Sequence, residues 1–191
     1  AEILCAVNVC RSFLLMNVGR CSVEMARNDP QVDPDYIARG NILVIESGDG
    51  VQPWAGPIIN LRESLSTGRI YVEAVDFLGV LEARSTGQGE DFTNVASGSV
   101  FLYILNRANA RGSTGIYAPG SVEPGPPIYD LVLGGQSLLS ALRELNSRTE
   151  YEFWIDLVVS SSRLSATARW GQRQGEDRAS GPYLYEGIHF S

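Results

Sequence analysis

Turn-forming residues divide the first 84 residues into short apolar runs, none of which has the length and spacing of an amphipathic helix. In one run Cys21, Val23 and Met25 share a face, as they would on a β-strand. A hairpin turn is predicted at residues 47–50, where Gly and Asp gather. A sheet of about five or six strands without a covering helix removes its exposed edges by closing into a barrel. Residues 1–84 are therefore predicted to form a small closed or split β-barrel.

The long strand predicted at residues 51–65 carries Trp54, Gly56 and Pro57. Such a strand bends in a small barrel, and Gly56 with Pro57 is the predicted bend or bulge. Trp54 is expected to pack in or against the barrel, and Gly56 to lie where a side chain would clash. A Gly56→Val substitution should then cost roughly 1–3 kcal/mol through strain. The neighbouring strands are predicted at residues 42–46, apolar on both faces, and 70–78.

The pattern changes at residues 85–91, a polar and glycine-rich stretch that is taken as a boundary. A helix follows in which four apolar residues share one face, and it is predicted to stop at Gly112. Those four are Phe101, Ile104, Leu105 and Ala108. Residues 113–127 are too rich in Pro and Gly for a helix or a central strand. A second helix, predicted at residues 137–148, carries a stripe of Leu138, Leu139, Leu142 and Leu145.

The last part of the chain is predicted to be β again. Residues 151–159 form an apolar run, residues 160–162 a turn, and residues 163–170 alternate cleanly. On one face of this alternating segment lie the apolar residues Leu164, Ala166, Ala168 and Trp170. The segment 183–190 resembles one further strand. The predicted fold class is α+β, mainly β: a split β-barrel at 1–84, a helical insertion with a Pro/Gly-rich loop at 85–149, and strands of a second, partial β-barrel at 150–191.

Charge and hydropathy exclude some classes of protein. The net charge is −7, whereas binding to nucleic acid depends on clustered basic residues. All 15 basic residues are Arg, whose planar donor fork suits bidentate contacts at subunit interfaces. No apolar run approaches the ~20 residues of a membrane-spanning helix. The first residues lack a basic leader, so no secretory signal is expected.

The residues able to ligate metal or act as nucleophiles are few. Cys5, Cys10 and Cys21 have no CxxC spacing and lie in apolar surroundings, so buried free thiols are expected. A Cys5–Cys21 or Cys10–Cys21 disulfide stays open on sequence alone. His189 is the single histidine, which leaves a zinc site almost without ligands and a Cys–His nucleophile pair poorly supported.

The polar clusters also have structural explanations. Two carboxylates on one strand face could serve a glycosidase, but exposed strands commonly carry such residues. The carboxylates concerned are Glu90, Asp91, Glu150, Glu152 and Asp156. Arg169 and Arg173, around the glycines at 171 and 175, could hold an anion, although a solvated hairpin end is favoured. The acidic residues Asp33, Asp35 and Asp49 are too sparse for calcium. The glycine-rich residues 85–90 lack the ending of a phosphate loop.

The aromatic residues toward the end of the chain could stack sugars or bases. They are Trp154, Trp170, Tyr183 and Tyr185. Packing in the core and at subunit interfaces is the favoured role, because Trp and Tyr dominate both settings.

The order of several packing motifs resembles that of bacteriophage tail-hub proteins, a family that includes siphophage tail hubs and the baseplate hubs of contractile tails. Residues 40–46 (GNILVIE) followed by 54–58 (WAGPI) are similar to the family's first-barrel hairpin. Residues 12–30 (SFLLMNVGRCSVEMARNDP) are similar to its opening strands. Residues 139–156 (LSALRELNSRTEYEFWID) and 163–171 (RLSATARWG) are similar to its helical insertion leading into a second barrel. The resemblance implies a ring, usually a trimer, around the tail channel, with no catalytic residues.

The resulting hypothesis is a structural component of a phage tail tip or baseplate hub, located in the virion. Its expected neighbours are further copies of itself, a distal tail protein ring and a tape-measure protein. No enzymatic activity, cofactor, metal or specific DNA binding is expected, and the channel lining is expected to be acidic or neutral. The alternatives are a cell-wall hydrolase module, which would require paired carboxylates or a Cys/His cleft, and a carbohydrate-binding β module, which would gather exposed aromatics in one concave patch.

Overall fold

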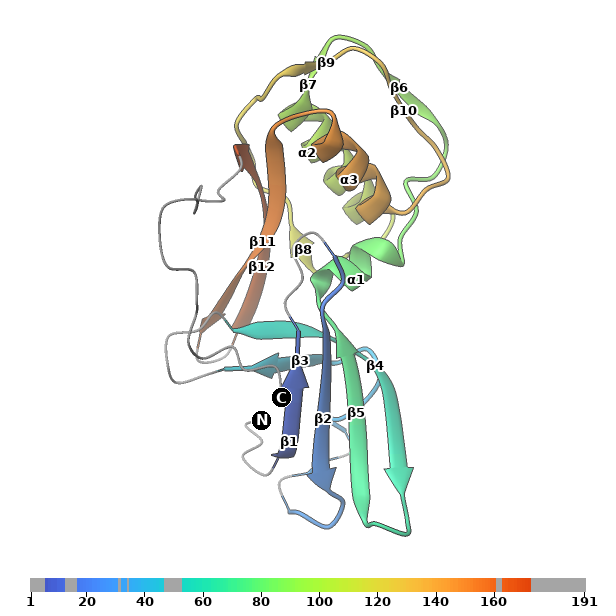
Figure 1. Ribbon diagram of the computed structural model, residues 1–191, viewed down its shortest axis with the longest axis vertical. Helices are drawn as coiled ribbons and strands as arrows, with labels where there is room; N and C mark the ends of the chain where they lie inside the picture. The colour runs from blue at the N-terminus through green and yellow to red at the C-terminus, as the bar shows by residue number, and fades with distance from the viewer. Residues whose placement is uncertain are drawn as a thin grey trace, which may run out of the picture.

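The structure is a computed structural model that describes residues 6–12, 17–30, 32–33, 35–46, 53–160 and 163–172. The sequence predictions for Cys5, Asp49, Arg173 and His189 lie outside the described residues, as do those for Tyr183, Tyr185 and the strand at 183–190. A curled sheet makes up one end of the molecule, and helices with a long β-hairpin make up the other (Figure 1).

The curled sheet has five strands, paired in the order β1-β2-β5-β4-β3. The strands are β1 (Ala6–Arg11), β2 (Arg20–Ala26), β3 (Ile42–Ile45), β4 (Trp54–Ser64) and β5 (Arg69–Val75). Within the part of the chain that the structure describes, β1 and β3 do not pair, so the sheet stays open. A side chain crosses between these two edges, since Arg11 Nη1 donates to the Ile45 carbonyl at 3.4 Å. The sheet is therefore a half-barrel, as the prediction of a split barrel required.

The inner face of this sheet is apolar. Cys21, Val23 and Met25 are all buried, which confirms the predicted alternation, and every second residue of β5 joins them. The outer face is polar and tied across the strands, as the Glu24–Arg69 ion pair shows. Alternation of the side chains thus decides which face of each strand packs.

Strand β4 changes partners along its length. Its first residues, up to Pro57, pair with β3, and its later residues, from Ile58, pair with β5. The register shifts between Ile58 and Asn60, which is where the strand turns from one partner to the other. The bulge was predicted at Gly56 and Pro57, whereas the observed register shift lies slightly further along the strand. The structure confirms the burial of Trp54, whose side chain is 1% exposed.

Helix α1 (Phe77–Glu82) replaces the end of a predicted strand. The apolar run at 70–78 was predicted to be one strand, but β5 ends at Val75. Asp76 stops it, because its Oδ1 accepts a hydrogen bond from Gly79 N at 3.2 Å and so caps the helix. Its Oδ2 accepts from Gly19 N at 2.8 Å, which joins the start of β2 to the same point.

The two longer helices are those that the apolar stripes predicted. They are α2 (Ser97–Ala110) and α3 (Leu138–Ser147), and they pack on each other. All four residues of the predicted stripe on α2, and all four leucines of α3, are buried. Ser137 caps α3 by accepting from Ser140 N at 3.0 Å. Beyond α2, Gly112 has φ +148°, which fits its predicted role as a stop.

The second sheet lies beside the helices and has three strands in the order β11-β12-β8. They are β11 (Tyr151–Ser160), β12 (Arg163–Gln172) and β8 (Ile116–Tyr117). Strands β11 and β12 form the predicted hairpin, and the predicted inner face of β12 packs against the helices. Two short ribbons complete the end of the molecule: β6 (Glu90–Phe92) with β10 (Leu131–Leu133), and β7 (Val95–Ala96) with β9 (Pro127–Ile128). The predicted fold class, α+β and mainly β, is confirmed.

Strand β3 and the start of β4 lie between two hydrophobic clusters. Leu43 and Trp54 belong to the cluster inside the half-barrel, whereas Val44 and Ala55 belong to the cluster around α2 and α3. Successive residues of a strand point to opposite faces. The strand that the sequence made apolar on both faces therefore packs against an apolar cluster on each side, although Ile42 at its start is exposed.

Candidate assembly surface

Of the predicted carboxylates, Glu152 and Asp156 lie on one face of β11, whereas Glu90 and Asp91 lie on β6 in another sheet. Asp156, on the outer face of the hairpin, accepts from Arg169 Nε at 2.8 Å and from Trp154 Nε1 at 3.0 Å. Arg169 is thus paired with a carboxylate, which agrees with a solvated hairpin rather than an anion grip.

Glu90, on β6, bonds to Tyr103 and to Arg107. The Tyr103 hydrogen bond, with help from the Arg107 guanidinium, holds the pKa of Glu90 below its usual range. A general acid of a glycosidase needs the opposite shift. The arrangement therefore clips β6 to α2 and does not resemble paired catalytic carboxylates.

Asp76 is a carboxylate whose pKa moves the other way. Burial raises the pKa of Asp76, and the N–H groups of Gly19 and Gly79 oppose that shift. Both oxygens of the carboxylate are turned toward this backbone. Asp76 therefore acts as a joint between β5, β2 and α1.

The cysteines differ from the prediction. Cys21 is buried as expected, and this burial, together with the nearby Cys10, raises the pKa of Cys21 to about 11. Cys10 is exposed, which corrects the expectation of a buried thiol. Cys10 lies opposite Ser22 and Cys21 lies opposite Arg11, so the two thiols point to opposite faces of the sheet. Both are free, and a Cys10–Cys21 disulfide is excluded by this geometry.

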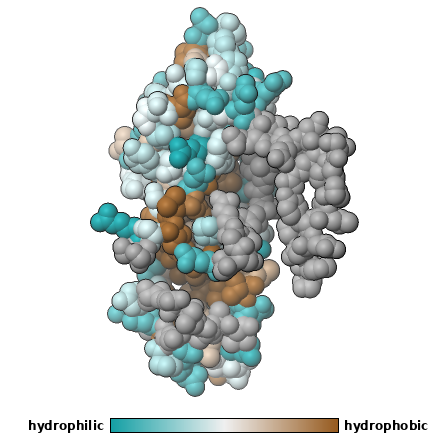
Figure 2. Space-filling model, turned by 90° about the vertical axis from the view of Figure 1, so that its left-hand side faces the viewer, coloured by the Kyte–Doolittle hydropathy of each residue, from teal (hydrophilic) through white to brown (hydrophobic). Residues whose placement is uncertain are grey.

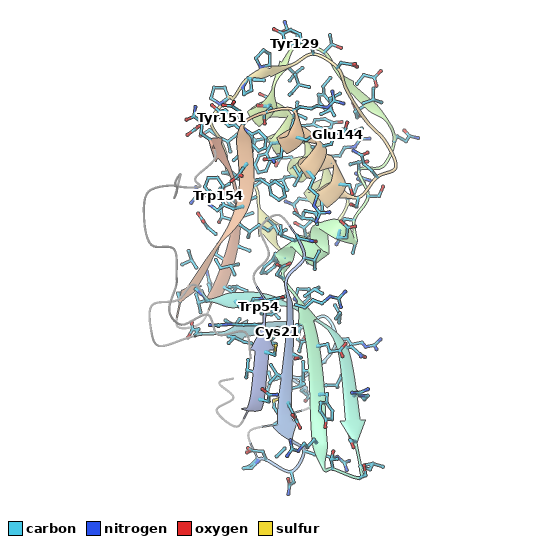
Figure 3. All side chains as sticks on the ribbon, viewed as in Figure 1. Cys21, Trp54, Tyr129, Glu144, Tyr151 and Trp154 are labelled. Carbon is cyan, nitrogen blue, oxygen red and sulfur yellow. The ribbon has the colours of Figure 1, made fainter. Side chains whose placement is uncertain are left out.

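The two described tryptophans of the hairpin do not form one aromatic platform. Trp170 is 4% exposed and stacks on Phe101 at 5.3 Å and on Tyr151 at 5.8 Å between ring centroids. Trp154 projects from the opposite face of the hairpin, where it lies against Gly171 (Figure 3). Trp170 therefore has the predicted core role, and the pair gives no support for a sugar-binding patch.

The remaining polar motifs are also built into the fold. Thr86 and Gly87, in the glycine-rich stretch, hold backbone contacts: Thr86 N donates to the Gln136 carbonyl at 2.9 Å. Asp33 Oδ1 accepts from Asp35 N at 2.9 Å within a turn. Among the described residues, no three His, Cys, Asp or Glu side chains gather in a group that could hold a metal, and no helix is long and apolar enough to cross a membrane.

What the surface does offer is apolar area. On the face shown in Figure 2, apolar residues gather in a band across the middle of the molecule, at the level where the hairpin meets the half-barrel in Figure 1. Val158 of β11 is 60% exposed and Ile42 of β3 is 44% exposed. A contiguous apolar band of this kind marks a contact surface more often than a solvated one.

The edges of the hairpin sheet differ from each other. On β8, the Ile116 N–H donates to Thr114 Oγ1 at 3.1 Å, and the Ile116 carbonyl accepts from Asn109 Nδ2 at 3.0 Å. Side chains thus close that edge. On β11, no strand within the described ranges pairs with the side away from β12. The sheet is protected on one edge and open on the other.

Comparison with known proteins identifies this arrangement. No protein-family model matches the sequence, and no curated protein matches it. Several solved structures do match the fold, among them the following two. One is the E. coli c3393 protein, a component of the type VI secretion system with structural similarity to the T4 bacteriophage tail proteins gp27 and gp5; it matches with a TM-score of 0.57 and 12% identity, over 87% of this chain and 49% of that one. The other is a tail protein from Neisseria meningitidis MC58, with a TM-score of 0.54 and 16% identity, over 83% of this chain and 44% of that one.

The chain has a tail-protein fold. The resemblance inferred from the order of the sequence motifs is thereby confirmed at the level of the fold. The chain spans about half the length of each of the two matched structures.

Proposed function

We propose that this chain is a structural subunit of a phage tail, placed at the tail tip or baseplate hub, where several copies surround the channel. The match of this chain to the c3393 protein over 87% of its length, and to a tail protein over 83%, carries this proposal. A location in the virion tail follows from the same match. The distal tail protein ring and the tape-measure protein are the proposed neighbours along the tail axis.

The surface of the chain supports an assembling role. Both of its larger sheets are open within the described ranges, and an apolar band runs across one face. Open strand edges are templates for pairing with another chain. A subunit that closes these surfaces only on assembly would present them in this way.

The groups that could support chemistry favour a non-enzymatic role. Glu90 and Asp156 each hold an Arg partner, and Asp76 is committed to backbone N–H groups. A hydrolase would place such carboxylates facing one another across a cleft. Here each stabilises its own part of the fold.

The oligomeric state tests this proposal. A hub subunit should bury well over ~1,000 Å² against its neighbours, which is enough for a stable complex. Native mass spectrometry of the purified chain over a range of concentrations should show a cyclic oligomer, with a trimer expected. A chain that stays monomeric at the highest concentration would remove the main support for the hub.

A further inference from the structure

We infer that the open edge of β11 pairs with β1 of a second copy of this chain. The inference rests on the proposed ring and names the strands that would join its subunits. Four features carry it: the composition of β11, the direction of its backbone groups, the protection of the opposite edge of its sheet, and the match between the faces of the two strands.

The composition of β11 lacks most of the devices that protect an edge. The strand has ten residues, with the sequence YEFWIDLVVS. It contains no Pro, Gly, Lys or Arg, and one of its two carboxylates, Asp156, is paired with Arg169. Natural edge strands are kept short, charged or bulged to prevent pairing. A long, apolar and regular edge is instead suited to receive another strand.

The free backbone groups of β11 can be assigned from the hairpin. Ser160 and Arg163 flank a two-residue loop, so they form the hydrogen-bonded pair nearest the turn. Counting back by twos from Ser160, the backbone groups of the even-numbered residues point toward β12. Those of the residues between them, Phe153, Ile155 and Leu157, therefore point away from β12. Tyr151, of the same parity, agrees, because its N–H donates to Thr149 Oγ1 at 3.2 Å and not to β12. The open edge therefore offers regularly spaced donors and acceptors.

The second edge of the hairpin sheet is closed by side chains, because Asn109 and Thr114 bond to the backbone of Ile116 in β8. Across the opening of the half-barrel, one hydrogen bond joins β1 to β3, from Arg11 to the Ile45 carbonyl. The outer edge of β1 is unpaired in the described part of the chain. A cyclic ring needs two different surfaces that fit each other. In this chain β11 and β1 supply such a pair of edges.

The apolar faces of the two strands match. Val9 of β1 lies on the inner face of the half-barrel and is 43% exposed, and Leu157 of β11 lies on the inner face of the hairpin sheet. A continuous sheet would align these apolar faces and place Cys10 beside the outer-face residues of β11. The two carboxylates of β11, Glu152 and Asp156, both lie on its outer face, and like charges on one face oppose pairing of β11 with itself.

Cross-linking through Cys10 tests the pairing. Since the register between copies is not fixed in advance, a cysteine replaces in turn each of the five outer-face residues of β11: Glu152→Cys, Trp154→Cys, Asp156→Cys, Val158→Cys and Ser160→Cys. In at least one variant, mild oxidation should give covalent species of two and three chains on a non-reducing gel. These bands should disappear with reductant and when Cys10→Ser is added.

Ser165→Cys is the matched control. Ser165 is exposed and lies directly opposite Val158, but on β12, one strand further from the open edge. Across that extra strand the Cα atoms would be about 10 Å from Cys10, beyond the reach of a disulfide. This variant should give no band above the single chain.

The outcomes separate the inference from the proposed function. A trimer by native mass spectrometry with no cross-link at any of the five positions refutes the β11–β1 pairing and leaves the ring standing. A band of two chains that persists after Cys10→Ser also refutes it, because the introduced cysteine would then have met another partner, such as its own copy. A monomer refutes the ring itself.

Discussion

Gly56 of β4 is the position at which one added methyl group should do most damage to the half-barrel. A Cβ built on Gly56 would lie 1.7 Å from the Val75 carbonyl oxygen and 2.8 Å from Asp76 Cα. The obstacle is backbone, not the end of a flexible side chain. A normal carbon–oxygen contact of about 3.2 Å would require the strands to separate by roughly 1.5 Å.

That separation is opposed by the surroundings of Val75 and Asp76. Asp76 N donates to the Gly19 carbonyl at 3.0 Å, and the Asp76 carboxylate caps α1. Gly56→Ala should therefore cost about 3 kcal/mol, the upper end of the usual cost of overpacking. For a chain of this size, that loss lowers Tm by roughly 6–12 °C. Differential scanning fluorimetry measures the shift directly.

Gly120→Ala is the control for Gly56→Ala. A Cβ at Gly120 would meet nothing within 4 Å. Its Tm should equal that of the parent chain or exceed it slightly, since Ala restricts the unfolded chain by about 0.4–1 kcal/mol. If Gly56→Ala melts within about 2 °C of the parent chain, less than ~1 kcal/mol has been lost and the close approach to Val75 is wrong.

Three further predictions concern titration, thiol chemistry and charge. Because burial raises the pKa of Asp76 above its unfolded value, the stabilising contribution of Asp76 is greatest at acid pH and falls as pH rises through the raised pKa. The unfolding free energy of Asp76→Asn minus that of the parent chain should therefore increase from pH 3 toward neutrality. A difference that stays constant with pH would contradict this prediction. Labelled with a thiol-reactive dye at pH 8, Cys10→Ser should show one fast-reacting thiol fewer than the parent chain. Cys21→Ser should show as many as the parent, because the buried Cys21 has its pKa raised to about 11. Fewer fast-reacting thiols in Cys21→Ser would place the Cys21 thiol at the surface. With a net charge of −7, the chain should not bind labelled duplex DNA in fluorescence anisotropy near physiological salt; tight binding that weakens steeply with salt would overturn the expectation of a non-binding channel.

The elements that the sequence predicted well are those with local signals. The stripe containing Leu142 and the alternation ending at Trp170 each repeat within one element, so α3 and the β11–β12 hairpin could be located before the structure. Helix α1 could not. Phe77 continues the apolar run of β5, and the capping carboxylate of Asp76 is fixed in part by Gly19, 57 residues away in the chain.

The candidate surface depended on pairing that no local pattern reveals. Cys10 and Cys21 lie in similar apolar runs, and only the β1–β2 register places one outside and the other inside. Whether β11 lies at the edge of a sheet depends on which strands pair with it, and not on its own sequence. Its apolar sequence is equally suited to a central strand, so the sequence predicted a strand but not an open one.

Strand β3 and the start of β4 form a layer that the two hydrophobic clusters share, and this layer affects how the molecule unfolds. Val44 and Ala55 line one cluster, and Leu43 and Trp54 line the other, on the same few residues of backbone. If either cluster melts, this layer loses one of its two supports and exposes apolar side chains of both strands. The half-barrel and the helical end should therefore unfold cooperatively, in one calorimetric transition, and neither should persist as a folded fragment after the other has opened.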